Sequence, residues 1–264
     1  MTVGKLIEKS NQCLEDREEI PNAPLWHMGK VAVLESKDSF NLLQNTIDYL
    51  TCKGKLDKVF TDNEKEFMKE LFEALWWGGQ YHGFKEAATL ADHYVNGGGE
   101  TLNINSKVYT DSVIVSDTML ALKSHIKELS SRKRPVSMIR SSNAEFLGSV
   151  HARNLKKGAR SVISQGYILS NGALLAEQSN LRLKNSDHRF YLTVNTTING
   201  DYFLSQWKVE SVYDFEPFEK GFITDIPLAK GFILKLPDGL SHYLTKVGVA
   251  KDFKYISRWQ DLWK

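Results

Sequence analysis

The sequence contains too few cysteines for a disulfide framework. Only Cys13 and Cys52 occur in 264 residues, so one bridge at most can form. Long apolar runs are also absent, since no stretch approaches the ~20 residues of a membrane span. The N-terminus lacks the apolar core of about 7–15 residues that a cleavable signal peptide needs. We therefore expect synthesis in the cytoplasm without a cleavable signal, with any export using a specialised secretion route.

The chain has no large excess of charge of either sign. Lys+Arg 34 against Asp+Glu 32 gives a formal net charge of +2, too small to steer the whole molecule toward nucleic acid or an anionic membrane. Basic side chains are spread over residues 132–160 in a pattern typical of a solvated face: Arg132, Lys133, Arg134, Arg140, Arg153, Lys156, Lys157 and Arg160. Nucleic acid is therefore not an expected partner, and a nucleic-acid-directed toxin is only a second alternative.

Several common catalytic motifs are missing. The glycines at Gly97–Gly99 follow a helical pattern and lack the downstream Gly-Lys-Ser/Thr of a phosphate-binding loop, so they indicate a helix end. No G-x-S-x-G, H-E-x-x-H or paired C-x-x-C motif is present. The sequence thus gives no support to a P-loop nucleotidase, a nucleophile-elbow hydrolase or a common zinc site.

The first half of the chain has the periodicity of helices. Thr61 and Glu64 have the spacing of a capping box, and an apolar stripe at i, i+3 and i+4 follows: Phe67, Met68, Leu71, Phe72, Leu75 and Trp76. Similar patterns predict helices at about 3–19, 37–51, 84–95 and 117–131. Residues 1–134 are therefore expected to form a helical region.

The second half changes to a period of two. Residues 190–198 alternate as a strand does, Asn199-Gly200 is a hairpin signal, and a second strand is expected at 202–215. Asn171-Gly172 indicates another hairpin after 161–170, although the segment beyond it also fits a helix. Residues 221–237 read as extended and 237–248 as a short helix. These patterns predict an α+β fold, with the helical layer followed by a curved, half-barrel-like antiparallel sheet at 135–264. We expect the two layers to form one continuous domain.

Two histidine-containing stretches are candidate sites. His82 and His93 lie among aromatic residues in a helical region, where packing is the simpler interpretation. In Asp187-His188-Arg189, His188 has the chemistry of an acid or base, and Arg189 suits phosphate through its planar fork of donors. The alternative is a polar turn before the strand at 190–198.

The stretch Lys208–Gly221, K-V-E-S-V-Y-D-F-E-P-F-E-K-G, is the third candidate. Alternation places Tyr213 on the face of the strand that carries Trp207, with Asp214 on the opposite face. Pro217 ends the strand because proline cannot donate to the sheet. Asp214 and Glu216 at this sheet margin could then hold a hard cation such as magnesium through carboxylate oxygens.

The V-Y-D-F sequence after an antiparallel strand resembles the motif region of the colicin M family of bacterial toxins. Members of that family cleave the pyrophosphate link of lipid II in the periplasm, and their motif has an aspartate, one variable residue, a tyrosine-aspartate pair and, after a spacer, a histidine-arginine pair. Tyr213 and Asp214 match the tyrosine-aspartate pair. Ser211 occupies the position of the first aspartate, and Lys220 and Gly221 fall near the histidine-arginine pair.

The resemblance implies an antibacterial toxin that acts on the cell envelope as a metal-dependent phosphoester hydrolase. Its substrate would be a lipid-linked peptidoglycan precursor, its cofactor magnesium, and its companions an immunity or delivery protein. Asp214 would act as a ligand or base, beside Tyr213, while Lys220 or Arg189 would stabilise negative charge. Because the motif is incomplete, Asp187, His188 or His242 would have to reach the site from elsewhere in the fold.

The alternative from another class is a non-catalytic protein-binding module, such as an adaptor, cargo or immunity-type protein. Aromatic residues make up 11% of the chain and can anchor an interface as well as fill a core. A contiguous exposed patch formed by Trp76, Trp77 and Tyr81 would favour this alternative.

Overall fold

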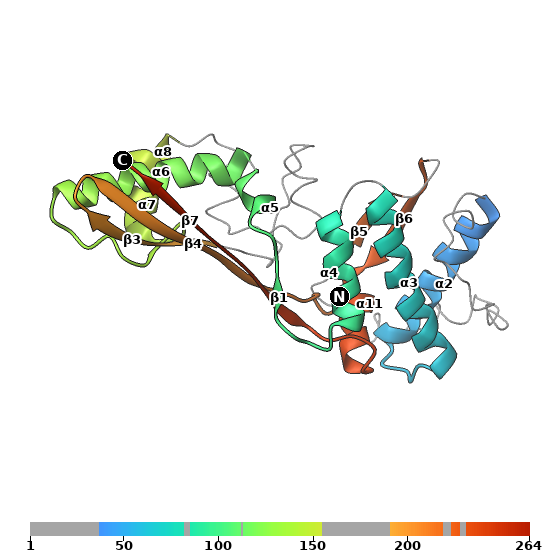
Figure 1. Ribbon diagram of the computed structural model, residues 1–264. Helices are drawn as coiled ribbons and strands as arrows, with labels where there is room; N and C mark the ends of the chain where they lie inside the picture. Colours follow the sequence, from blue (N-terminus) through green and yellow to red (C-terminus); the bar gives the residue numbers. More distant parts are fainter. Residues whose placement is uncertain (1–36, 82–84, 112, 155–190, 219–222, 228–230) are drawn as a thin grey trace. The chain divides into compact units, whose positions relative to one another are not determined.

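The computed structural model describes residues 37–81, 85–111, 113–154, 191–218, 223–227 and 231–264. The fold is α+β, with helices preceding a sheet, as predicted (Figure 1). The chain divides into two compact units: unit 1 comprises residues 1–99 and 214–252, and unit 2 comprises residues 100–213 and 253–264. The units are therefore interleaved along the sequence, rather than meeting at residue 134. Cys13, the helix expected at 3–19 and the hairpin expected at Asn171-Gly172 lie outside the described residues.

Unit 1 combines helices with a small sheet. The helices α2 (Lys37–Lys55), α3 (Asp62–Tyr81) and α4 (Lys85–Asn96) confirm the patterns read from the first half of the sequence. The strands β5 (Ile223–Pro227) and β6 (Ile233–Pro237) pair antiparallel, and α11 (Asp238–Lys246) follows directly. The apolar stripe of α3 is buried at Phe67, Met68, Leu71 and Phe72, and Cys52 is buried in α2.

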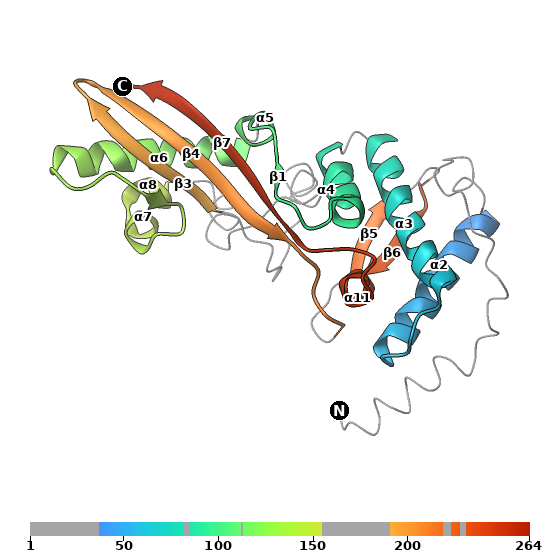
Figure 2. The same cartoon turned by 60° about the horizontal axis from the view of Figure 1, so that its bottom comes forward.

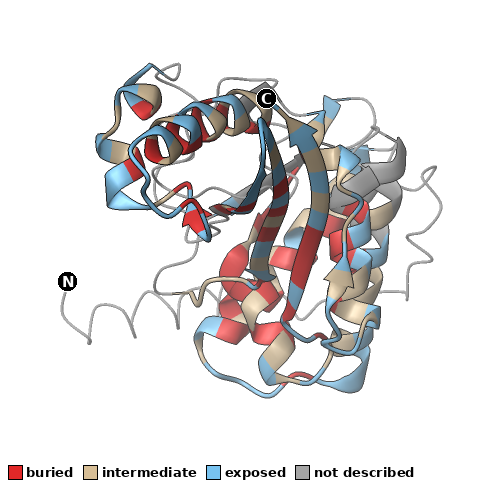
Figure 3. Ribbon diagram, turned by 60° about the vertical axis from the view of Figure 1, so that its left-hand side comes forward, coloured by how far each residue is buried: buried red, intermediate tan, exposed pale blue. Residues whose placement is uncertain are grey.

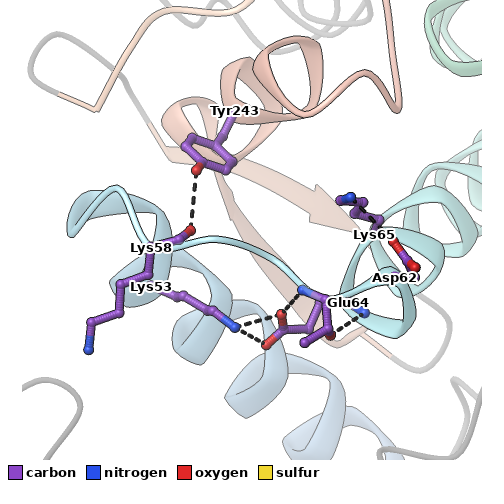
Figure 4. Close-up of polar contacts among 7 residues, drawn as sticks. Lys53, Lys58, Asp62, Glu64, Lys65 and Tyr243 are labelled. Carbon is purple, nitrogen blue, oxygen red and sulfur yellow. Dashed lines mark hydrogen bonds and ion pairs between the residues drawn. The ribbon is translucent and has the colours of Figure 1, made fainter.

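The start of α3 has the reciprocal cap that the sequence predicted. The Thr61 backbone N–H donates to Glu64 Oε2 at 2.6 Å, and the Glu64 N–H donates to Thr61 Oγ1 at 3.3 Å. Lys53 Nζ, from the end of α2, reaches both Glu64 oxygens at 2.7 and 2.6 Å (Figure 4). One carboxylate thus caps α3 and ties it to α2.

The helix α11 is fixed to the turn between α2 and α3. The Tyr243 hydroxyl donates to the Lys58 carbonyl at 3.2 Å (Figure 4), and the Tyr243 ring packs on Phe60 with 4.8 Å between ring centroids. On the other side, Gln44 of α2 bonds both backbone groups of Lys235 in β6, at 3.1 and 2.9 Å. These contacts join β6 and α11 to α2 and to the turn after it, which lie 185 to 191 residues earlier in the chain.

Unit 2 contains an open five-stranded mixed sheet in the order β1-β7-β4-β3-β2. The long strands are β3 (Tyr191–Asn199), β4 (Tyr202–Tyr213) and β7 (Phe253–Trp263), and β4 pairs antiparallel with each of the other two. The two-residue strand β2 (Ile139–Arg140) pairs antiparallel with β3, so the strands of this sheet within 135–264 are antiparallel as expected. The sheet is mixed because β1 (Leu102–Asn103), from the first half of the chain, pairs parallel with β7. The Asn199-Gly200 hairpin is confirmed, with Gly200 at φ +60.

Helices cover one face of this sheet. They are α5 (Lys107–Thr110), α6 (Val113–Ser131), α7 (Ala144–Gly148) and α8 (Val150–Arg153), and α6 crosses the direction of the long strands (Figure 2). Trp207, Val209 and Tyr213 of β4 are buried on one face, while Glu210 and Val212 are exposed on the other, as the alternation predicted. The red and blue bands along the strands in Figure 3 show this alternation.

No helix in the described part of the chain is long and apolar enough to cross a membrane.

Candidate functional site

The strand β4 ends at Tyr213, whose side chain is in the core of unit 2. Tyr213 is 7% exposed, and its ring stacks on that of Phe253 with 5.2 Å between centroids. The two residues are also cross-strand partners at the end of the β4–β7 pair. The first half of the predicted tyrosine-aspartate pair is therefore held by packing.

The segment after β4 is anchored in unit 1 by two phenylalanines. The Phe215 ring packs edge-on against Phe72 of α3 and Tyr94 of α4, at centroid distances of 6.0 and 5.0 Å. The Phe218 ring lies against Gly239 and Gly54, so close to Gly239 that an added Cβ would be 2.2 Å from Phe218 Cδ1. Glycine at both positions makes room for the ring, and the segment is held on either side of Glu216.

Asp214 and Asp252 are brought together by the register of the sheet. Tyr213 pairs with Phe253 at the end of the antiparallel strands β4 and β7. Asp214 follows Tyr213 and Asp252 precedes Phe253, so the two aspartates leave the sheet side by side. The Asp252 segment is also fixed in unit 1, because the Lys251 backbone N–H donates to the Tyr94 carbonyl at 3.0 Å. Both aspartate side chains are exposed to solvent.

Asp252 is the carboxyl that the surroundings perturb. Burial of part of the group and the neighbouring charge of Asp214 raise its pKa above the usual 3.8, and His242 opposes them. A raised pKa follows from both causes, because each disfavours the ionised form. Asp214 and His242 therefore both lie within electrostatic reach of Asp252, and we call these three residues the Asp–His cluster.

His242 has a fixed orientation in α11. Its Nδ1 lies 2.8 Å from the Phe215 carbonyl oxygen. A carbonyl can only accept, so Nδ1 carries the hydrogen, and in the neutral ring Nε2 keeps the lone pair. The ring is half-buried, and the Tyr94 hydroxyl donates to the neighbouring Ser241 carbonyl at 2.9 Å. The arrangement provides a histidine oriented as a base or ligand, within electrostatic reach of the Asp252 carboxyl group.

The sequence pointed to Asp214 as a candidate and to His242 as one of three residues that could complete its site, but it gave no signal for Asp252. Nothing local marks Asp252, since its place depends on a strand register between residues forty positions apart in the chain. His188, Arg189, Lys220 and Gly221 lie outside the described residues, and Asp187 does too. Ser211, at the position of the family's first aspartate, is half-buried in β4.

The predicted magnesium site lacks a ready-made protein cage. Among the described residues, no group of three or more His, Cys, Asp or Glu side chains is arranged to hold a metal ion. Magnesium is often held by one or two carboxylates together with substrate phosphates, so its binding by Asp214 and Glu216 stays a prediction.

A second group of titratable side chains lies in unit 2, around α6. His125 is 4% exposed, burial is the main cause of its lowered pKa, and its Nδ1 has no hydrogen-bond partner. His151 Nε2 lies 2.9 Å from Glu128, and Arg134 pairs with Glu145. Because His125 is buried and kept neutral, this group is a packing and ion-pair network.

Several of the remaining candidates from the sequence are half-buried side chains or members of ion pairs. Trp76 is half-buried, and the side chains of Trp77 and Tyr81 lie outside the described residues, so the expected aromatic patch stays untested. Of the dispersed basic residues, Arg132 and Arg134 pair with carboxylates of Glu128 and Glu145. His93 of α4 is half-buried.

Comparisons with known proteins give no relative: no family model, curated protein or solved structure matches this chain.

Proposed function

We propose that this protein is an antibacterial effector that acts in the cell envelope, where it hydrolyses a phosphoester or pyrophosphate bond of a lipid-linked peptidoglycan precursor. The observation that carries the proposal is the Asp–His cluster: two carboxyl groups side by side and a histidine whose tautomer is set by the Phe215 carbonyl. The resemblance of V-Y-D-F to the colicin M motif region supports the choice of substrate.

In this proposal, His242 is the general base. With Nδ1 donating to Phe215, Nε2 accepts a proton from the attacking water. Asp252 is the better proton donor of the two aspartates because its pKa is raised, so it protonates the departing oxygen. The negative charge of Asp214 favours the protonated form of Asp252, because it is one of the causes that raise the Asp252 pKa.

Lys220 and Arg189 are proposed to stabilise the negative charge that develops on the phosphate, and His188 to assist them. Magnesium, if held by Asp214 and Glu216 with the substrate, would supply Lewis-acid charge stabilisation. Tyr213 is proposed to position Asp214 through its packed ring.

The test is bacterial growth with the chain expressed in the cytoplasm or fused to a periplasmic export signal. The exported wild type is expected to kill, and Asp214→Asn, Asp252→Asn and His242→Gln are expected to abolish killing. Glu66→Gln, which alters an exposed carboxylate on α3, is the matched control and is expected to kill like the wild type. Circular dichroism of each purified variant checks that it is folded.

Two results would overturn the proposal. Killing by folded Asp214→Asn and His242→Gln at the wild-type level would remove the Asp–His cluster from the activity. Absence of killing by the wild type in both compartments would favour the non-catalytic binding module, and killing from the cytoplasm alone would favour a nucleic-acid-directed toxin.

A further inference from the structure

Unit 2 exposes large apolar side chains at one end of its sheet. Ile198 is 44% exposed, Tyr202 43%, Leu204 38% and Leu262 65%. All four lie at the β3–β4 hairpin or at the adjoining end of β7, and we call them the hairpin-end patch. Leu204 and Leu262 are direct cross-strand partners on the face of the sheet opposite to α6, while Ile198 lies on the other face.

The strand ends that carry the patch are held by ring stacking and side-chain hydrogen bonds. Directly between its members, Phe203 and Trp263 are cross-strand partners whose rings stack at 4.4 Å and 13°. Trp263 Nε1 donates to Ser205 Oγ at 2.9 Å, and that hydroxyl also lies 2.9 Å from Thr196 Oγ1. The exposed side chains therefore project from ordered strand ends.

Lysines flank this end of the sheet on both faces: Lys264 on the outer face with Leu204 and Leu262, and Lys123 and Lys127 on the α6 face with Trp263. Lys264 Nζ lies 4.6 Å from the centre of the Tyr202 ring, and Lys127 Nζ lies 5.7 Å from that of Trp263. Lys123 also lies over Trp263 but pairs with Asp261, and Asp201 in the hairpin turn is the opposing exposed carboxylate. Farther along the same outer face, Lys254 and Arg258 add positive charge, and Lys208 pairs with Glu210.

Apolar and aromatic side chains rimmed by lysines match the chemistry of a membrane surface. Tyrosine and tryptophan rings favour the headgroup level, leucine and isoleucine favour the acyl boundary, and lysine stems extend along apolar surface so that their ammonium groups reach phosphates. A nucleic acid backbone would gain from the lysines but not from exposed leucines and isoleucine.

We propose that the hairpin-end patch docks on the surface of an anionic phospholipid bilayer. The patch inserts its apolar side chains at the interface while Lys127 and Lys264 contact lipid phosphates. This binding involves unit 2 residues only and does not depend on the Asp–His cluster, so its measurement stands apart from that of catalysis.

Co-sedimentation of the full chain with vesicles tests the proposal. The wild type is expected to bind phosphatidylcholine vesicles that contain phosphatidylglycerol, more weakly at high salt and more weakly with phosphatidylcholine alone. Leu204→Gln/Leu262→Gln is expected to lower the affinity at least about tenfold, as is Lys127→Gln/Lys264→Gln with the anionic vesicles. Val212→Gln is the matched control, because Val212 is 41% exposed on the same face of β4 but at the other end of the strand.

Failure of the wild type to bind anionic vesicles would overturn the proposal. Equal losses of vesicle affinity in Leu204→Gln/Leu262→Gln and in Val212→Gln would also overturn it. Sedimentation equilibrium provides a further check. A dimer that Leu204→Gln/Leu262→Gln dissociates would assign the patch to contact between two copies and would also overturn it. Asp214→Asn is expected to bind vesicles like the wild type whether or not the proposed hydrolysis is correct.

Discussion

Individual side chains at the end of the β4–β7 pair combine structural and chemical roles. Tyr213 and Phe253 form the last pair of the β4–β7 register in the core of unit 2, and the residues just beyond that pair, Asp214 and Asp252, are both acidic. Like charges directly opposite each other destabilise an antiparallel pair. A position that costs stability yet holds two carboxyl groups beside an oriented histidine is the pattern expected of a functional site.

The cost at Asp252 predicts a pH-dependent change in stability. Its raised pKa means that Asp252 binds a proton more tightly in the folded protein than in the unfolded chain. The resulting gain in the free energy of unfolding is fully present below pH 3.8 and is lost as pH rises through the folded-state pKa. Asp252→Asn is therefore expected to be more stable than the wild type at neutral pH, by less than about 1 kcal/mol because solvent screens the exposed group. Urea unfolding at neutral pH and near pH 3 measures the difference, which should vanish in acid; a loss of stability at neutral pH would contradict the assignment.

Gly239 is expected to be the least replaceable residue near the site. In Gly239→Ala, the new Cβ would be 2.2 Å from Phe218 Cδ1 and 2.7 Å from its Cα, so backbone has to move. We expect a loss of about 2–3 kcal/mol in the free energy of unfolding. Gly148→Ala, where a Cβ would meet nothing within 4 Å, is the matched control and should be neutral; similar losses in both variants would contradict this view of Phe218.

Among the elements, α2 and α3 are joined by Glu64, which caps one helix and pairs with the other. Removing its side chain leaves Lys53 without this partner in a largely buried position, where its side chain is 13% exposed. Glu64→Ala is expected to lower the free energy of unfolding by about 2 kcal/mol, from the lost cap and the lost ion pair together. Thermal unfolding compares it with Glu66→Ala on the exposed side of α3, and equal stability of the two variants would be the contrary result.

The elements that the sequence predicted are those determined by neighbouring residues. The Thr61/Glu64 cap, the glycines after α4 and the Asn199-Gly200 hairpin each depend on a few consecutive positions, and each is confirmed. No local pattern predicted the bounds of the long strand β7, because its pairing with β4 depends on residues that are far apart in sequence. Because that pairing brings Asp252 to Asp214, the sequence alone predicted one carboxyl group of the site and not the other.

At the level of the whole molecule, each unit is completed by a distant part of the chain. Unit 1 includes α11 and the β5–β6 pair, which come after residue 213. Unit 2 includes β7, which lies next to the central strand β4. A chain truncated after Tyr213 is therefore expected to lose the cooperative unfolding of both units, because it loses apolar side chains from each core. Differential scanning calorimetry measures this. A cooperative transition in the truncated chain would show that one unit is complete without the returning segments.

Interleaving also explains where the candidate site arises. The chain enters unit 1 at Asp214 and leaves it at Asp252, and α11 between them supplies His242. The Asp–His cluster thus depends on the folding of unit 1 around the returning segment, which is a property of the topology and not of any local motif.

The most direct measurement is the release of the phosphorylated head group from a radiolabelled lipid-linked peptidoglycan precursor by the purified chain, with and without magnesium. We expect release by the wild type and by Glu66→Gln, and a decrease of at least about a hundredfold for folded His242→Gln and Asp214→Asn. No release by the folded wild type under either condition, or equal release by all four proteins, would contradict the proposed hydrolysis.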